Sequence, residues 1–223
     1  MLKRLAAATI ALSILTWPSA AWTQNTPPIP DGWGRRLPEL PKSDQPAPVH
    51  DLSGTWTPAN GPGDGIGGTG AKNMPLDNKP EHQLPYTPLA LKTMEANKPG
   101  NGARQVDPSE DNDPAVIYCD PQGMPRQDLY ELRTTQILQT PLSVVILYEF
   151  SKIWRVIWAD GRELPPRGAE PRWFGYSVGK WVDDSTFVVE TTGTDERTWL
   201  DKAGRPHSGD LRVVETFHRV SHD

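Results

Sequence analysis

Cysteine is almost absent from this chain of 223 residues, since Cys119 is the only one. A single cysteine excludes an internal disulfide, so a stable fold has to rest on an apolar core. Basic residues are not in excess either, because 23 Lys and Arg stand against 28 Asp and Glu, for a formal net charge of −5. A chain this acidic is poorly suited to nucleic acid or to an anionic membrane surface, and we expect neither as a partner.

Residues 5–16 form an apolar run that is too short to span a bilayer as a mature helix. Lys3 and Arg4 precede it, and the small residues Ser19-Ala20-Ala21 follow it. This order is typical of a signal peptide, predicted at residues 1–21 with cleavage before Trp22. Cleavage would remove two basic residues and no acidic one, which takes the net charge to −7. We therefore expect a periplasmic or extracellular protein with no membrane span in the mature chain.

Proline and glycine divide the chain unevenly, with most of the 24 Pro residues placed before Pro125. Residues 22–50 form a Pro-rich tail, because repeated fixed φ angles and missing N–H groups discourage both helix and sheet. Residues 51–223 are predicted to form a single domain with an insertion at 60–130. One short helix is predicted in that insertion at Pro88–Asn97, with Thr87 as its N-cap and Pro99-Gly100 as its stop.

Residues 134–220 alternate short runs of β-branched and aromatic residues with turn signals, and no segment has the helical period. Turn residues stand at Thr140–Ser143, Asp160-Gly161 and Asp183-Asp184. The pattern predicts an all-β fold, an antiparallel meander closed into a small up-and-down barrel. The predicted strands are 52–57, 133–139, 143–150, 152–159, 172–181, 186–192 and 211–220.

Two resemblances add to this prediction. Asp51-Leu52-Ser53-Gly54-Thr55-Trp56 resembles the first strand of lipocalin-like barrels, whose Gly-x-Trp places a Trp across the closed end of the barrel. The span from Asp51 to Asp223, nearly the whole mature body, is similar to an uncharacterised family of secreted bacterial proteins. Its recurring segments are Tyr86-Thr87-Pro88, Cys119-Asp120-Pro121-Gln122-Gly123-Met124-Pro125-Arg126, Gln139-Thr140-Pro141, Asp160-Gly161-Arg162, Trp173-Phe174-Gly175-Tyr176-Ser177-Val178-Gly179, and Asp195-Glu196-Arg197-Thr198-Trp199-Leu200-Asp201 with Pro206-His207-Ser208. The resemblance implies a lipocalin-like fold rather than an activity. Because the family pattern continues with a further strand, the resemblance implies that the chain is truncated at its C-terminus or forms a barrel that does not close.

The first candidate site is aromatic. Its members lie on consecutive predicted strands and would line an apolar ligand pocket if their faces converged inside the barrel: Trp154, Trp158, Trp173, Tyr176 and Trp181. The alternative is that these rings fill the core of a barrel without a ligand. Glu215 is the predicted polar residue of this site; with Arg155, Arg172 and Glu190 it would supply a polar anchor or a buried ion pair. Alternation places Trp154 and Trp158 on one face of a strand and Arg155 on the other, but does not say which face is internal.

The second candidate site is catalytic and lies in the loop before the last predicted strand. His207 oriented by Asp201 could act as a general acid or base, and Arg197 could hold an anionic group of a substrate. The alternative is that these side chains only hydrogen-bond their own loop.

No metal or cofactor site is expected. His218 and His222 would lie roughly 13 Å apart along a strand, too far to share one ion. Gly61 to Gly70 contains two Gly-x-Gly-x-x-Gly frames but no flanking strand and helix, so a surface loop is predicted there. Cys119 is expected to be a small buried residue.

The leading hypothesis is an exported protein that binds a small hydrophobic or aromatic molecule. A cofactor-free isomerase, lyase or hydrolase and a structural envelope interaction module are the alternatives. The sequence leaves the oligomeric state open.

Overall fold

The computed structural model describes residues 43–58, 84–97, 113–129, 132–201 and 204–222. These residues belong to one compact unit that starts at Ser43. The predicted signal peptide, most of the Pro-rich tail and the glycine frames of residues 61–70 lie outside the described residues.

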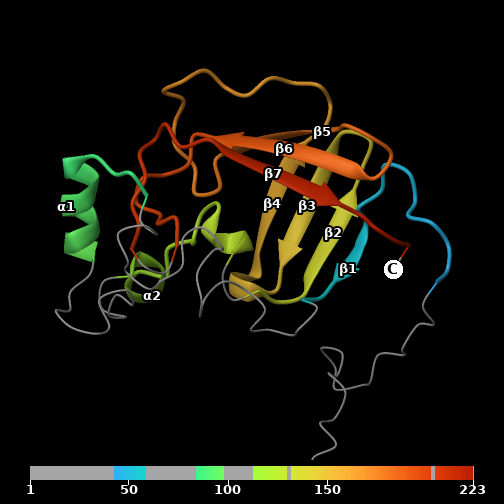
Figure 1. Cartoon of the computed structure of the whole chain (residues 1–223), viewed down its shortest axis with the longest axis horizontal. Helices are drawn as coiled ribbons and strands as arrows, with labels where there is room; N and C mark the ends of the chain where they lie inside the picture. Colours follow the sequence, from blue (N-terminus) through green and yellow to red (C-terminus); the bar gives the residue numbers. More distant parts are fainter. Residues whose placement is uncertain (1–42, 59–83, 98–112, 130–131, 202–203, 223) are drawn as a thin grey trace, which may run out of the picture. The chain divides into compact units, whose positions relative to one another are not determined.

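The regular secondary structure of the described residues is mostly β-strand, with two α-helices and two single 3₁₀ turns (Figure 1). The strands are β1 Gly54–Trp56, β2 Thr135–Gln139, β3 Ser143–Tyr148, β4 Ile153–Trp158, β5 Tyr176–Trp181, β6 Thr186–Thr192 and β7 Val213–His218. The helical elements are α1 Pro88–Asn97, α2 Pro114–Ile117, η2 Arg126–Asp128 and η3 Phe150–Lys152. The all-β, barrel-like fold that the sequence predicts is therefore confirmed.

All seven strands form one sheet in chain order, from β1 to β7. Short polar turns join β2 to β3 and β5 to β6. Between β2 and β3, the Thr140 amide donates to the Ser143 carbonyl at 2.8 Å. Between β5 and β6, Asp183 Oδ1 accepts hydrogen bonds from the amides of Ser185 and Thr186 at 2.9 and 2.7 Å. The predicted turns at these two places are correct because each supplies a side-chain oxygen that fixes its own backbone.

One pairing departs from the predicted antiparallel meander, because β4 and β5 run parallel. The prediction fails here since the turn at Asp160-Gly161 does not lead into a hairpin. After this turn the chain passes through Pro165, Pro166 and Pro171. It returns to the end of the sheet where β4 begins, and β5 then runs in the same direction as β4. A parallel pair requires such a crossover. We call residues 159–175 the crossover; it is the long orange loop of Figure 1.

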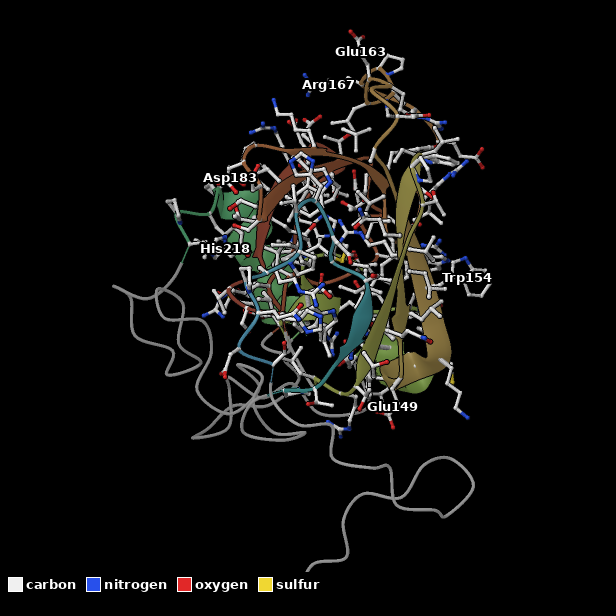
Figure 2. The ribbon with its side chains drawn as sticks, turned by 90° about the vertical axis from the view of Figure 1, so that its right-hand side faces the viewer. Glu149, Trp154, Glu163, Arg167, Asp183 and His218 are labelled. Carbon is white, nitrogen blue, oxygen red and sulfur yellow. The ribbon has the colours of Figure 1, made fainter. Side chains whose placement is uncertain are left out.

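The sheet curls so that β5–β7 face β1–β4 across a common interior, in the manner of half a barrel (Figures 1 and 2). β1 and β7 stand at the two ends of the strand order and do not pair. Arg219, just after β7, spans this seam by donating from Nη1 to the carbonyls of Asp51 and Ser53 at 3.0 and 3.3 Å. Its guanidinium also lies 5.2 Å from the ring centre of Trp56. A side chain thus connects the two edges where a closed barrel would have a backbone ladder.

The buried residues show which face of each strand points inward. The buried apolar core consists of Leu52, Ile137, Val144, Ile146, Tyr148, Ile157, Phe187 and Val189. On β4 the inward residues are Ile153, Arg155 and Ile157, so the tryptophans of this strand point outward. On β5, Gly179 allows close packing, because a Cβ there would lie 2.3 Å from Phe187 Cζ.

Helix α1 has the predicted bounds, and Thr87 Oγ1 accepts from the Ala90 amide at 3.3 Å as its N-cap. α2 was not predicted; Asp113 caps it through the Ala115 amide. Cys119 is exposed, contrary to expectation. Among the described residues no helix is long and apolar enough to cross a bilayer, and no group of three or more His, Cys, Asp or Glu side chains could hold a metal ion.

Candidate functional site

A groove opens on the outer side of the sheet, where β4 and β5 meet. Their parallel ladder has only two residue pairs, Ile157 with Ser177 and Trp158 with Val178. Before these pairs the two chains diverge, and the crossover borders the space between them. The tip of the crossover, with Glu163 and Arg167, projects from one end of the molecule in Figure 2. A short ladder and a long crossover therefore create a groove of about 820 Å³.

Four of the five predicted aromatic residues line this groove: Trp154, Trp158, Trp173 and Tyr176, joined by Phe174. They come from β4, the crossover and the start of β5. Trp154 keeps 66% of its surface exposed and Trp158 keeps 37%. Figure 2 shows Trp154 pointing away from the body of the protein. The predicted convergence thus occurs on the outer face of the sheet, and the interior that the sequence analysis considered is filled by the core.

Arginines stack on three of these rings. Arg162 lies 3.7 Å from the ring centre of Trp158, Arg172 lies 4.4 Å from that of Tyr176, and Arg197 lies 4.2 Å from that of Trp173. A guanidinium over an aromatic face is attracted by the negative face of the ring and leaves its N–H groups free in its own plane. The groove is therefore both aromatic and rich in hydrogen-bond donors.

Two of the three arginines are held by carboxylates two residues away. Arg162 binds Asp160 through Nε and Nη2 at 2.9 and 2.6 Å. Arg197 binds Asp195 in the same way at 3.0 and 2.6 Å. Hydrogen bonds from these arginines hold the pKa of Asp160 and of Asp195 below the usual range. Both pairs stiffen the rim of the groove.

The other two predicted ligand-binding residues lie elsewhere. Trp181 points inward and packs between His50 and Phe187, with ring centres 5.0 and 5.1 Å away. Glu215 lies on the inner face of β7 and binds Arg155 with both carboxylate oxygens, at 2.9 and 2.5 Å. The sequence left open whether Glu215 anchors a ligand or forms a buried ion pair, and the structure has the buried ion pair.

Arg155 is the centre of an internal polar cluster. Its side chain is 1% exposed. Besides Glu215 it donates to Ser177 at 3.2 and 3.1 Å, to Thr191 at 2.8 Å and to Asp128 at 3.5 Å. These partners come from four elements, so one guanidinium connects β4 with β5, β6, β7 and η2. A buried charge with this many partners is compensated rather than isolated.

Asp128 is the unusual member of this cluster. Burial raises the pKa of Asp128 to about 7; the positive charge of Arg155 opposes the rise, and the charge and hydrogen bond of Glu215 add to it. Its side chain keeps 27% exposure, beside a small cavity of about 30 Å³ that Tyr148 also lines. The Tyr148 hydroxyl makes no hydrogen bond of normal geometry within the described residues, and burial next to Asp128 raises its pKa. Two carboxyl groups thus contact one guanidinium, and burial raises the pKa of one of them, Asp128, toward neutral pH.

The three predicted catalytic residues have separate partners. His207 Nε2 lies 2.8 Å from Thr198 Oγ1, and His207 Nδ1 lies 3.0 Å from the Ser208 carbonyl. Burial lowers the pKa of His207. Asp201 is buried and forms an ion pair with Arg205. Arg197 stands over Trp173 in the groove. The structure therefore joins Arg197 to the aromatic site and shows His207 and Asp201 with local partners.

The sequence analysis missed Asp128, Tyr148 and Arg162 as site residues. Only alternation along neighbouring strands could have placed Tyr148 with Arg155, because the members of the cluster are far apart in the chain. Arg162 follows the Asp-Gly turn, and its stacking on Trp158 leaves no pattern in the sequence.

A second groove, of about 730 Å³, lies against the crossover and the segment before β7. Its described lining residues include Pro166, Glu196 and Leu211 but no aromatic side chain. The ring-lined groove is therefore the stronger candidate. Comparisons with protein-family models, with curated proteins and with solved structures found no match for this chain.

Proposed function

We propose that this protein binds a small planar aromatic molecule in the groove between β4, β5 and the crossover. The observation that carries the proposal is the convergence of Trp154, Trp158, Trp173 and Tyr176 from three segments of the chain on one open groove. An exposed aromatic cluster is costly to leave in water unless a partner covers it. The volume, about 820 Å³, suits a ligand the size of a metabolite.

The arginines favour a flat ligand. Each stacked guanidinium covers part of one ring and fixes its orientation, as Arg162 does for Trp158. Trp154 has no such cover and is the most exposed ring of the groove. Offset stacking on an indole contributes about 0.5–1.5 kcal/mol beyond the burial of surface, so stacking on two tryptophans adds about 1–3 kcal/mol to the binding of a bicyclic ring.

Tryptophan fluorescence tests the proposal with 2-naphthalenemethanol, a neutral bicyclic probe. We expect saturable quenching, and we expect Trp158→Ala or Trp154→Ala to weaken binding at least fivefold, as for an aromatic contact worth about 1 kcal/mol or more. Tyr118→Ala is the control, since Tyr118 is 72% exposed and does not line the groove. Absence of saturable binding to the folded wild-type protein, or equal losses in the control, would contradict the proposal.

The enzyme and the structural-module hypotheses stay predictions. Among the described residues, His207 contacts Thr198 and Ser208, and Asp201 forms an ion pair with Arg205; these contacts support neither hypothesis over the other.

A further inference from the structure

The three groove arginines differ in their ionic partners. Arg162 and Arg197 are each bound by an aspartate. Arg172 makes no ion pair with any carboxylate of the described residues, although it is exposed and stacks on Tyr176. Its positive charge is therefore the one on the groove wall that no described side chain neutralises.

Arg172 is nevertheless well positioned. Its amide donates to the Gly193 carbonyl at 3.0 Å, and its own carbonyl accepts from the amides of Gly175 and Asp195 at 2.9 and 3.0 Å. The ring beneath it is also fixed, because the Tyr176 hydroxyl donates to the Glu170 carbonyl at 2.9 Å. A guanidinium with a fixed backbone and a fixed stacking partner loses little freedom when it binds an anion.

The acidic residues of the groove do not compete for this guanidinium. Asp195 is bound by both nitrogens of Arg197 that face it. Glu163 belongs to the projecting tip of the crossover, as Figure 2 shows. The carboxylate of a ligand would therefore be the first acidic partner of the Arg172 guanidinium.

We propose that the ligand is an aromatic carboxylate, whose ring stacks on the groove tryptophans while its carboxylate binds the guanidinium of Arg172. This inference rests on the proposed function and specifies its substrate class. A planar guanidinium presents two parallel N–H groups that match the two oxygens of a carboxylate. Aromatic rings and an uncommitted arginine in one groove select a molecule that has both a flat apolar body and an anionic end.

A matched pair of probes tests the anionic end separately from the ring. 2-Naphthoate and 2-naphthalenemethanol share the ring system and differ in charge at neutral pH. We expect wild-type protein to bind 2-naphthoate at least tenfold more tightly at low ionic strength, and we expect salt to reduce this preference. Arg172→Gln should abolish the preference while affinity for 2-naphthalenemethanol changes less than twofold.

Two further variants keep the test decisive. Arg167→Gln is the control, because Arg167 lies on the same crossover but outside the groove lining and should leave the preference intact. Arg172→Lys keeps the charge without the planar fork and should retain a reduced preference, which also serves if Arg172→Gln fails to fold.

Three outcomes would overturn the inference. If the wild-type protein binds both probes with equal affinity, the ligand needs no carboxylate, and only the proposed binding of an aromatic ring stands. If Arg167→Gln and Arg172→Gln lose the preference for 2-naphthoate equally, the preference comes from the net charge of the protein and not from a contact with Arg172. Binding of neither probe overturns the proposed function together with this inference.

Discussion

Replacing Asp128 by Asn should make the protein less sensitive to alkaline pH. Asp128 binds Arg155 inside the barrel, next to Glu215, and burial raises the pKa of Asp128 to about 7. An Asn side chain has the shape of the protonated carboxyl group and can likewise donate a hydrogen bond to Glu215. The variant therefore fixes the cluster in the state that the wild-type cluster holds only while Asp128 is protonated.

The sign follows from proton binding. The unfolded carboxyl group has a pKa of about 3.9 and is ionised at pH 5, whereas the folded one still holds its proton. The folded state thus binds more protons than the unfolded state, and the free energy of unfolding falls as pH rises toward 7. The contribution is complete below the unfolded pKa and is lost above the folded pKa.

The magnitude can be worked from the same values. Between pH 5 and a pKa of about 7, the wild-type protein loses about 2.7 kcal/mol at 1.36 kcal/mol per unit. Solvent reaches 27% of the Asp128 side chain, which reduces this to roughly 2 kcal/mol. We expect the free energy of unfolding of Asp128→Asn, minus that of the wild-type protein, to rise by this amount from pH 5 to pH 8.5.

Urea unfolding at several pH values measures this difference directly. Taking the difference between two proteins cancels the remaining titrating groups, including His207, whose lowered pKa acts in the opposite direction. Asp210→Asn is the control, because it removes an exposed carboxylate that pairs with the exposed Arg167 and should cost less than about 1 kcal/mol. A difference that stays constant within 0.5 kcal/mol, roughly the scatter of such extrapolations, would refute the raised pKa of Asp128.

Two other predictions concern the fold. Arg219→Ala should lower the free energy of unfolding by about 1–3 kcal/mol in urea unfolding, because two seam carbonyls lose their donor; no change would show that the seam holds without it. Gly179→Ala should cost about 1–3 kcal/mol, because its Cβ would lie 2.3 Å from Phe187 Cζ, and a thermal midpoint equal to that of the wild type would contradict the close packing.

Local patterns made the order of the strands and the first helix predictable, although β5 begins at Tyr176 and not at the predicted residue 172. β6 has the predicted bounds, and Thr87-Pro88 starts α1 where an N-cap and a first-turn proline place it. These features depend on neighbours in the sequence, which is why one sequence sufficed. The parallel pairing of β4 with β5 depends instead on the path of residues 159–175, which carry turn signals but no regular period.

The candidate site shows the same limit. Alternation correctly placed Trp154 and Trp158 on one face of β4, but both faces of this strand carry large side chains and one of them carries Arg155. Charge normally marks the outer face, and here it marks the inner one. Glu215, which compensates Arg155, lies 60 residues further along the chain, so no local pattern could reveal that the arginine is buried.

The internal cluster explains how the outer groove can exist at all. β4 and β5 share only two backbone pairs, which is too short a ladder to fix the spacing of the groove walls. Arg155 on β4 donates twice to Ser177 on β5, and Ser177 lies 2.9 Å from Thr191 on β6. These buried side-chain bonds tie β4, β5 and β6 together on the inner face, next to the short ladder. Trp154 and Tyr176 each adjoin a member of this network in sequence, so the distance between the aromatic walls depends on the buried polar cluster around Arg155.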